Sequence, residues 1–273
     1  MEWNVSPEIF RIGPIALRWY SLMFILSFLL GYYLVRKMFL AEKKPEQYMD
    51  ALFLYMFGGT IIGARLGHCL FYDPVYYLTH PLEIFAVWQG GLASHGATIG
   101  IIIAVYLFSQ KRKETPFLWT LDRVAIVVAL AGFFIRLGNL FNSEIVGAPT
   151  TVPWAFIFPR YEQDPVPRHP AQLYEAIAYL LVFIFLFLLY RRTQANTRHG
   201  LIVGIFLVLV FGFRFFVEFF KEVQESWEAS LPLDMGQLLS IPAVLLGLYL
   251  IKTAKPPVVQ KSTPTGKRKK AGA

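Results

Sequence analysis

Seven apolar segments of membrane-spanning length dominate this sequence of 273 residues. They lie at roughly 17–35, 51–72, 92–109, 117–141, 171–190, 201–220 and 235–251. A helix needs about 20 mainly apolar residues to cross a bilayer, whereas a membrane β-barrel is built from ~10-residue stretches of alternating apolar and polar residues. None of the seven segments alternates in that way. The sequence therefore predicts an all-α polytopic membrane protein with seven transmembrane helices.

The composition excludes the main soluble classes. Hydrophobic residues make up 56% of the chain and charged residues only 16%, whereas a soluble domain usually carries about 25% charged residues. Cys69 is the single cysteine, so an internal disulfide and a multi-cysteine metal site are both excluded. Because it lies inside an apolar run, we expect a buried packing thiol.

The net charge of +8 is explained by membrane topology. Basic residues gather in alternate loops, at 36–44, 111–113 and 191–198, and the C-terminal stretch 252–273 holds seven basic and no acidic residues. By the positive-inside rule the C-terminus is cytoplasmic and the N-terminus is outside. We expect a seven-helix domain over 1–251 with loops on the outer face, followed by a flexible basic tail. Nucleic acid is not predicted as a partner.

Polar side chains within these spans are predicted to lie near the outer face. An ionisable residue inside a span costs ~2.5–3.5 kcal/mol on insertion scales, so each requires a partner or a function. The second, fourth and sixth segments run outward and the third runs inward in this topology. The residues so placed, together with those of the loop that follows the fourth segment, are Arg65, His95, Arg136, Asn139, Asn142, Glu144, His169, Arg214 and Glu218.

Three of these residues are arginines, whose guanidinium groups present a fork of donors that matches phosphate. An anionic phospholipid is therefore a natural ligand for the cluster. The alternative is that the arginines pair locally or extend to the interface. Arg214 and Glu218 are spaced i,i+4 and could form such a local pair.

His95 is flanked by small residues in the run Gly90-Gly91-Leu92-Ala93-Ser94-His95-Gly96, which permits close approach of a substrate or of another backbone. Its ordinary pKa lies near 6.5, so it can act as a base at neutral pH without a metal. The alternative is a histidine that packs at the start of a helix. Ser94 does not form a hydrolase pair with His95, because adjacent helical residues point ~100° apart. No zinc-protease, hydrolase or phosphate-loop motif occurs in the sequence.

Four long runs carry a family resemblance. They are Trp88-Gln-Gly-Gly-Leu-Ala-Ser-His95-Gly, Gly132-Phe-Phe-Ile-Arg136-Leu-Gly-Asn139-Leu-Phe-Asn142-Ser-Glu144, Arg168-His-Pro-Ala-Gln-Leu-Tyr-Glu175 and Phe213-Arg214-Phe-Phe-Val-Glu218-Phe-Phe. Together with the opening Ile12-Gly13-Pro14-Ile-Ala-Leu-Arg-Trp19-Tyr20, they resemble the bacterial prolipoprotein diacylglyceryl transferases. The likeness runs in order from about residue 9 to 251.

The resemblance implies a transferase of the bacterial plasma (inner) membrane that needs no metal or organic cofactor. Such an enzyme moves the diacylglyceryl group of phosphatidylglycerol to the lipobox cysteine of a prolipoprotein signal peptide, in the first step of lipoprotein maturation. A thioether forms and glycerol phosphate leaves. The family roles carry over to His95, Arg136, Asn139, Glu144, Arg214 and Glu218, with Arg136 matching the arginine of the phospholipid-binding motif. One departure is Val210, where the family often has tyrosine.

These considerations give a hypothesis for the active site at the outer leaflet. His95 is expected to act as the base, and Arg136 and Arg214 to stabilise the phosphate; the alternative is that Arg214 generates the thiolate through its field alone. The expected substrate-binding residues are Tyr20, Arg65, Arg136, Asn139, Asn142, Glu144, His169, Gln172, Tyr174 and Glu218. A transporter and a lipid- or peptide-binding scaffold are the competing functions. A transporter should have a polar path that reaches both membrane faces.

Overall fold

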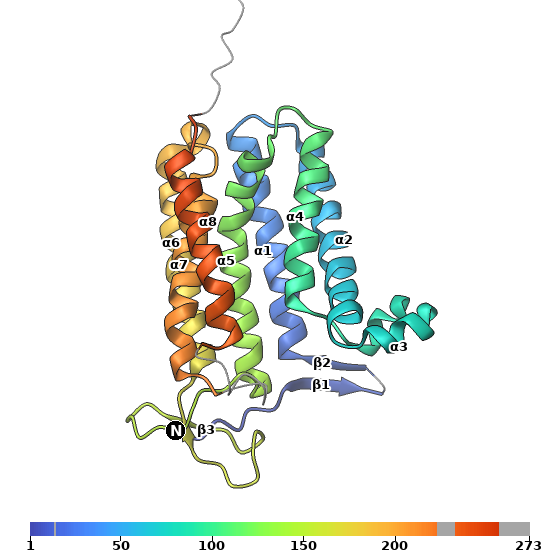
Figure 1. Ribbon diagram of the computed structural model, residues 1–273, viewed down its shortest axis with the longest axis vertical. Coiled ribbons are helices and arrows are strands. Elements are labelled where there is room, and N and C mark those ends of the chain that lie inside the picture. The colour runs from blue at the N-terminus through green and yellow to red at the C-terminus, as the bar shows by residue number, and fades with distance from the viewer. Residues whose placement is uncertain (14, 223–232, 257–273) are drawn as a thin grey trace, which may run out of the picture.

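The structure is a computed structural model that describes residues 1–13, 15–222 and 233–256. Seven long helices make up most of it (Figure 1). They are α1 (Trp19–Ala41), α2 (Glu46–Phe71), α4 (Ser94–Gln110), α5 (Phe117–Asn142), α6 (Ala171–Thr193), α7 (Leu201–Val217) and α8 (Met235–Thr253). Residues 257–273 of the expected basic tail lie outside the described residues.

The prediction of a helical multi-pass membrane protein is confirmed. Within the described ranges, six helices are long and apolar enough to cross a membrane, and they coincide with six of the seven predicted segments. The remaining segment forms α4, a shorter apolar helix of 17 residues. Local signals set several helix starts: α5 and α6 each follow a proline, and Asp234 forms a capping box with Gln237 before α8.

Short elements at one end of the bundle were not predicted from the sequence. Two antiparallel two-stranded sheets, β1 (Glu8–Ile12) with β2 (Ile15–Arg18) and β3 (Phe156–Ile157) with β4 (Pro167–Arg168), lie there. The short helices α3 (Pro74–Thr79), η1 (Pro81–Phe85) and η2 (Val87–Gln89) form an arm between α2 and α4, and η4 (Glu218–Phe220) follows α7. A further short helix, η3 (Gln194–Asn196), follows α6 at the opposite end of the bundle. Sequence periodicity does not reveal elements this short.

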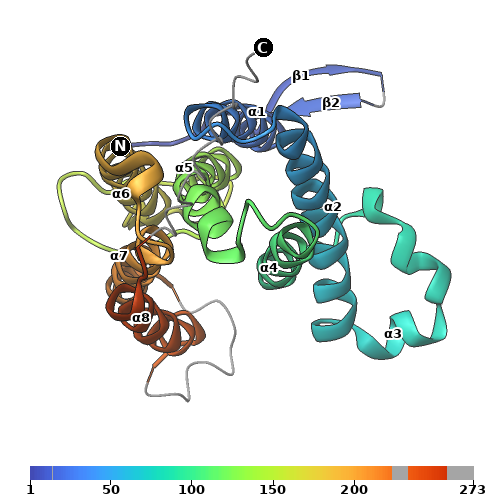
Figure 2. The same ribbon diagram turned by 90° about the horizontal axis from the view of Figure 1, so that it is seen from above.

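Neighbouring helices pack in pairs. Seen along the bundle, α2 lies against α4, α1 against α5, α5 against α6, and α7 against α8, while the arm projects outward beyond α2 (Figure 2). The paired packing leaves α5 in the middle of the molecule, in contact with α1, α4, α6 and α7. Of the six helices long enough to cross a membrane in the described ranges, α5 has the largest buried share.

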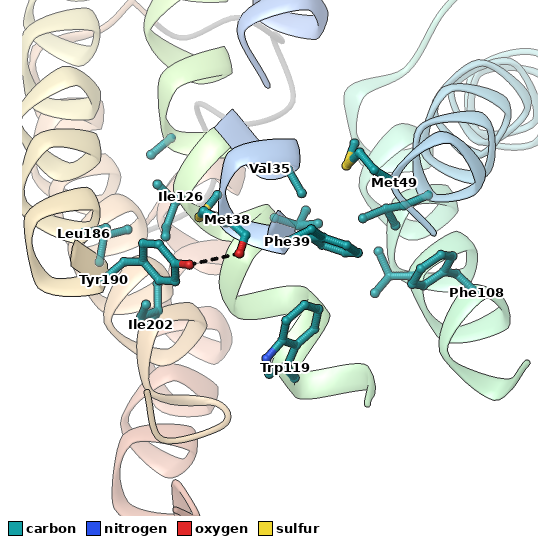
Figure 3. Packing of buried hydrophobic residues seen from close by; sticks show 14 of the residues in the cluster. Val35, Met38, Phe39, Met49, Phe108, Trp119, Ile126, Leu186, Tyr190 and Ile202 are labelled. Atoms are coloured by element: carbon teal, nitrogen blue, oxygen red, sulfur yellow. Dashed lines mark hydrogen bonds between the residues drawn. The ribbon is translucent and has the colours of Figure 1, made fainter. Parts of the chain in front are cut away.

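The apolar core occupies the end of the bundle opposite the sheets. Phe39, Phe108, Leu186 and Ile202 are fully buried there, although they come from four different helices (Figure 3). Trp119 packs edge-on against Phe39, with ring centroids 5.1 Å apart. Burial of large apolar side chains stabilises this end by close packing, because they interdigitate at crystal-like density.

A buried ion pair closes the core at the same end. Glu42 follows α1, and its carboxylate accepts from Arg123 at 2.8 Å, from Trp119 Nε1 at 2.9 Å and from Tyr190 Oη at 2.8 Å. Arg123 and Glu42 have side chains that are 0% and 3% exposed. Both charges are removed from water but are paired with each other. The contacts of Glu42 therefore link the end of α1 to α5 and α6.

Glycines let α2 and α4 touch through their backbones. Gly59, Gly63 and Gly67 on α2 face Gly96 and Gly100 on α4, as the small-residue spacing predicts. A Cβ atom at Gly67 would lie 2.6 Å from the Gly96 Cα, and one at Gly100 would collide with the Gly59 carbonyl oxygen. This close contact holds α4 beside a helix of full spanning length.

The glycine contact yields a stability prediction with a matched control. Gly100→Ala should lower the Tm in detergent, because overpacking against backbone costs ~1–3 kcal/mol. Gly58→Ala should leave the Tm unchanged or raise it slightly, since nothing lies within 4 Å of the added Cβ and alanine favours the helix by roughly 0.5–1 kcal/mol. Equal Tm shifts for the two variants would contradict the close approach of α2 and α4.

Candidate active site

Charged side chains meet where α5, α6 and α7 reach the sheet-bearing end of the bundle. Arg136 lies six residues before the end of α5, or ~9 Å along its axis, and Glu175 lies in the second turn of α6. Arg214 occupies the last turn of α7, and Glu218 begins η4. Four charged residues from four different elements thus lie in one region at this end of the bundle.

The charges form an alternating chain. Arg136 Nε lies 3.0 Å from Glu175 Oε2, and Lys221 Nζ lies 3.3 Å from the same oxygen. Lys221 Nζ also lies 3.0 Å from Glu218 Oε1, which in turn lies 3.2 Å from Arg214 Nε. The order is therefore Arg136, Glu175, Lys221, Glu218, Arg214. Each carboxylate is shared by two cations, as a charge removed from water requires.

Exposure differs between the members of this chain. The side chain of Glu175 is 0% exposed and that of Lys221 is 5% exposed, whereas the side chains of Arg136 and Arg214 are 14% and 30% exposed. Tyr179 Oη donates to Glu175 Oε1 at 3.0 Å and adds a neutral partner. Glu175 is thus fully buried, the side chain of Glu218 is 10% exposed, and the two arginines are partly exposed.

An amide network continues from Arg136 into the loop after α5. Arg136 donates to Asn139 Oδ1 at 3.2 Å, and Asn139 Nδ2 donates to Glu144 Oε2 at 3.2 Å. Asn142 Nδ2 donates to Glu144 Oε1 at 2.9 Å, and Gln172 Nε2 donates to the Glu144 backbone carbonyl at 2.6 Å. Four residues expected at the site, Asn139, Asn142, Glu144 and Gln172, are thus brought together beside Arg136.

Tyr20 and His95 approach this region from other helices. Tyr20 is the second residue of α1 and packs on Gly138, where a Cβ atom would lie 2.8 Å from the Tyr20 ring. The charges of Glu144 and Arg136 both reach the Tyr20 phenol. His95 lies in the first turn of α4 with its side chain exposed, and the positive charge of Arg214 reaches its imidazole.

Arg65 is bonded differently from the other two arginines of the expected cluster. Its guanidinium donates to the backbone carbonyls of Glu83 at 2.5 Å, Ile84 at 2.9 Å and Gly90 at 2.8 Å, and it is 3% exposed. These bonds fasten the arm to α2. A substrate-binding role for Arg65 stays a prediction, and its contacts in this structure are those of an anchor.

His169 and Tyr174 form a pair beside the charge chain. His169 Nδ1 lies 3.1 Å from Tyr174 Oη, which accepts from Trp154 Nε1 at 2.8 Å. The His169 ring also packs edge-on against Phe220, with centroids 5.3 Å apart. The pair touches the segment that carries Glu218, but no described hydrogen bond joins it to Arg136.

Sequence reasoning missed three residues of the charge chain and its surroundings. Glu175 and Tyr179 lie one turn apart on α6, and an acidic residue in an apolar span was a signal that a cation must face it. Lys221 has no signal of its own, because nothing in its sequence position shows that the chain turns back toward α6. Among the described residues, no three His, Cys, Asp or Glu side chains are grouped to hold a metal ion.

The loop between α5 and α6 is pinned by a second ionic group. Arg168 is buried and bridges Glu162 at 2.6 Å and Glu222 at 3.0 Å. The hydrogen bond from Arg168 lowers the pKa of Glu162 from 4.5 to about 2. This loop carries Glu144 and His169, so its attachment positions part of the site.

These features define the class: a helical multi-pass membrane protein with a partly buried, arginine-bearing polar site at one end of its bundle. Residues 7–253 match the family described as prolipoprotein diacylglyceryl transferase. The chain belongs to that family.

Relatives named phosphatidylglycerol–prolipoprotein diacylglyceryl transferase match over nearly the whole chain. The Chloroherpeton thalassium protein is 55% identical over 249 residues, which cover 91% of this chain and 92% of the relative. The Porphyromonas gingivalis protein is 48% identical over 96% of this chain and 97% of the relative, and the Tolumonas auensis protein is 47% identical over 91% and 95%.

The low pKa of Glu162 predicts a pH-dependent loop. Because the folded-state pKa lies below the unfolded value of 4.5, the Arg168 contact stabilises the loop above that pH and is lost as the pH falls through about 2. A spin label at Asp164→Cys, in a Cys69→Ala background, should become more mobile over this window. With Glu162→Gln the label should be mobile throughout. A wild-type label that stays immobile at pH 2 would contradict the prediction.

Proposed function

We propose that this protein transfers the diacylglyceryl group of phosphatidylglycerol to the lipobox cysteine of a prolipoprotein, the first step of bacterial lipoprotein maturation. Family membership supports the activity. The observation in the site that carries it is the pair of partly exposed arginines, Arg136 and Arg214, at the two ends of the chain of charges. Two guanidinium groups at membrane depth suit a phosphodiester that approaches from the lipid phase.

The reaction needs a thiolate, a bound phosphodiester and a stabilised leaving group. A cysteine thiol of pKa ~8.5 is mostly protonated at neutral pH. In the proposed mechanism His95 takes the thiol proton, and the sulfur attacks the glycerol carbon that bears the phosphate. A carbon–sulfur bond forms and the carbon–oxygen bond breaks, so glycerol phosphate leaves with the electron pair.

The remaining residues have supporting roles in this mechanism. Arg136 and Arg214 stabilise the negative charge that develops on the departing phosphate, which is electrostatic catalysis. Asn139, Asn142 and Glu144 orient the glycerol headgroup by hydrogen bonds, and the Tyr20 phenol lies beside them. Direct activation of the thiol by the field of Arg214 is the alternative to a base at His95.

The topology that we propose has seven spans with the site at the outer leaflet of the plasma membrane. The α4 helix rises about 26 Å at 1.5 Å per residue, close to the ~30 Å hydrocarbon core, and packs along α2. The basic loops at 36–44, 111–113 and 191–198 lie at the end of the bundle away from Arg136. By the positive-inside rule that end is cytoplasmic.

Packing in the bundle favours an enzyme over a transporter. Between Arg123 near one end of α5 and Arg136 near the other, Ile126, Ala129 and Leu130 are buried. The polar groups at the cytoplasmic end are satisfied internally, since Asp122 accepts from the backbone amides of Gly200 and Val203 and Arg123 donates to Glu42. These contacts do not form the continuous polar path that transport requires.

The activity has a direct test. Purified protein incubated with phosphatidylglycerol micelles and a lipobox peptide should add a diacylglyceryl mass to the peptide cysteine, read by mass spectrometry. The same peptide with serine in place of cysteine should remain unmodified. If both lipid and peptide bind but no mass is added, the protein is a binding scaffold instead.

The role of His95 predicts a large loss on substitution. His95→Gln keeps a polar side chain but removes the base, so transfer should fall by roughly 10²–10⁴-fold, the usual contribution of general-base catalysis. Ser94→Ala, one residue earlier, should leave the rate nearly unchanged and serves as the control. Full transfer by the glutamine variant would shift the assignment to the field of Arg214.

A further inference from the structure

We propose that Lys221 is a positioning residue that sets the charge balance of the site toward an anionic lipid. Its ammonium group is the shared cation between Glu175 and Glu218, and it keeps these carboxylates from neutralising Arg136 and Arg214 fully. The inference rests on the proposed function for the identity of the lipid. It assigns a role to a side chain that need not touch the substrate.

The contacts of Lys221 place it at the centre of the chain of charges. Its Nζ lies 3.3 Å from Glu175 Oε2 and 3.0 Å from Glu218 Oε1, and its side chain is 5% exposed. A buried lysine is stable only with such partners, and here it has one on each side. Because Glu175 comes from α6 and Glu218 from η4, the ammonium also joins two separate elements.

The charge count shows what Lys221 contributes. Arg136, Lys221 and Arg214 face Glu175 and Glu218, so this chain of five carries a net charge of +1. With Glu144, which is hydrogen-bonded to Asn139, the net charge is zero. Without Lys221 the remaining four charges would sum to zero, and the net charge with Glu144 included would be −1. A site of net charge −1 repels a phosphodiester, and the repulsion is strong where the dielectric constant is low. Lys221 therefore prevents electrostatic repulsion between the site and an anionic lipid.

The backbone fixes the lysine at this point. Gly147 forms a β-bridge with Lys221, and the Ala148 amide donates to the Phe220 carbonyl at 2.9 Å. A Cβ atom at Gly147 would lie 2.7 Å from that carbonyl oxygen, so glycine is needed for the approach. The loop that carries Glu144 thereby holds the backbone of Lys221 in place. The lysine side chain therefore starts from a fixed point beside the two carboxylates.

The test separates a charge effect from a merely structural one. Lys221→Met should raise the KM for phosphatidylglycerol about tenfold, the factor for one unit charge ~10 Å away at an effective dielectric constant of ~20, with kcat changed much less. Lys221→Arg should restore the KM. Lys221→Met combined with Glu218→Gln returns the net charge to its starting value, so its KM should fall back below that of the single variant.

Two controls make the outcome specific. Lys111→Met removes the same charge from an exposed position at the opposite end of the bundle and should leave the KM unchanged. If Lys221→Met does not fold, Lys221→Gln keeps a hydrogen-bond donor and removes only the charge, and the same tenfold rise is expected.

A binding measurement keeps the inference independent of turnover. Native mass spectrometry should show that the wild-type protein retains phosphatidylglycerol over phosphatidylcholine and that Lys221→Met loses this preference. Absence of transfer in the wild type would overturn the proposed function but leave this comparison intact. A variant with a lower Tm, an unchanged KM and an unchanged lipid preference would show that Lys221 is structural only and would overturn the inference.

Discussion

The burial of one carboxylate constrains the half of this protein that carries the proposed site. Glu175 is fully buried within a membrane-spanning helix, where an unpaired charge is far too costly to persist. Its partners come from three directions: Arg136 on α5, Tyr179 on α6 itself, and Lys221 beyond α7. The requirement to satisfy this group therefore fixes how α5, α6 and the end of α7 sit together. Arg136 and Arg214 take their positions from that arrangement.

The bundle divides its tasks between its ends. At the cytoplasmic end of the proposed topology, large apolar side chains and the Glu42–Arg123 pair form a closed, densely packed core. At the other end, the chain of charges lies beside a smaller apolar cluster that contains Leu140, Val146 and Phe158, and the loops, the arm and the two small sheets surround the candidate site. A densely packed apolar half can hold the helices in place while the polar half carries the proposed site, so the proposed catalysis and stability need not depend on the same residues.

Much of the fold and part of the site were predictable because both depend on local sequence patterns. The segment 117–141 was predicted as a span, and the helix is Phe117–Asn142, since length and hydropathy alone define such an element. The run from Arg136 to Glu144 was expected to act together, and its amides and carboxylate do form one network. Arg65 was placed at the correct end of its helix, but no sequence pattern showed that its donors would be taken up by the carbonyls of the arm.

The sequence by itself determined that this chain is a helical membrane protein, which of its segments are helices, and which family it belongs to, because apolar length and long ordered motifs are properties of the linear chain. Only the tertiary structure decided which charges meet. Lys221 lies 46 residues after Glu175 in the numbering, yet the two are in ionic contact at 3.3 Å. Such pairing depends on how the loop at Gly147 returns against the end of α7, and that long-range backbone contact leaves no periodic signal in the sequence.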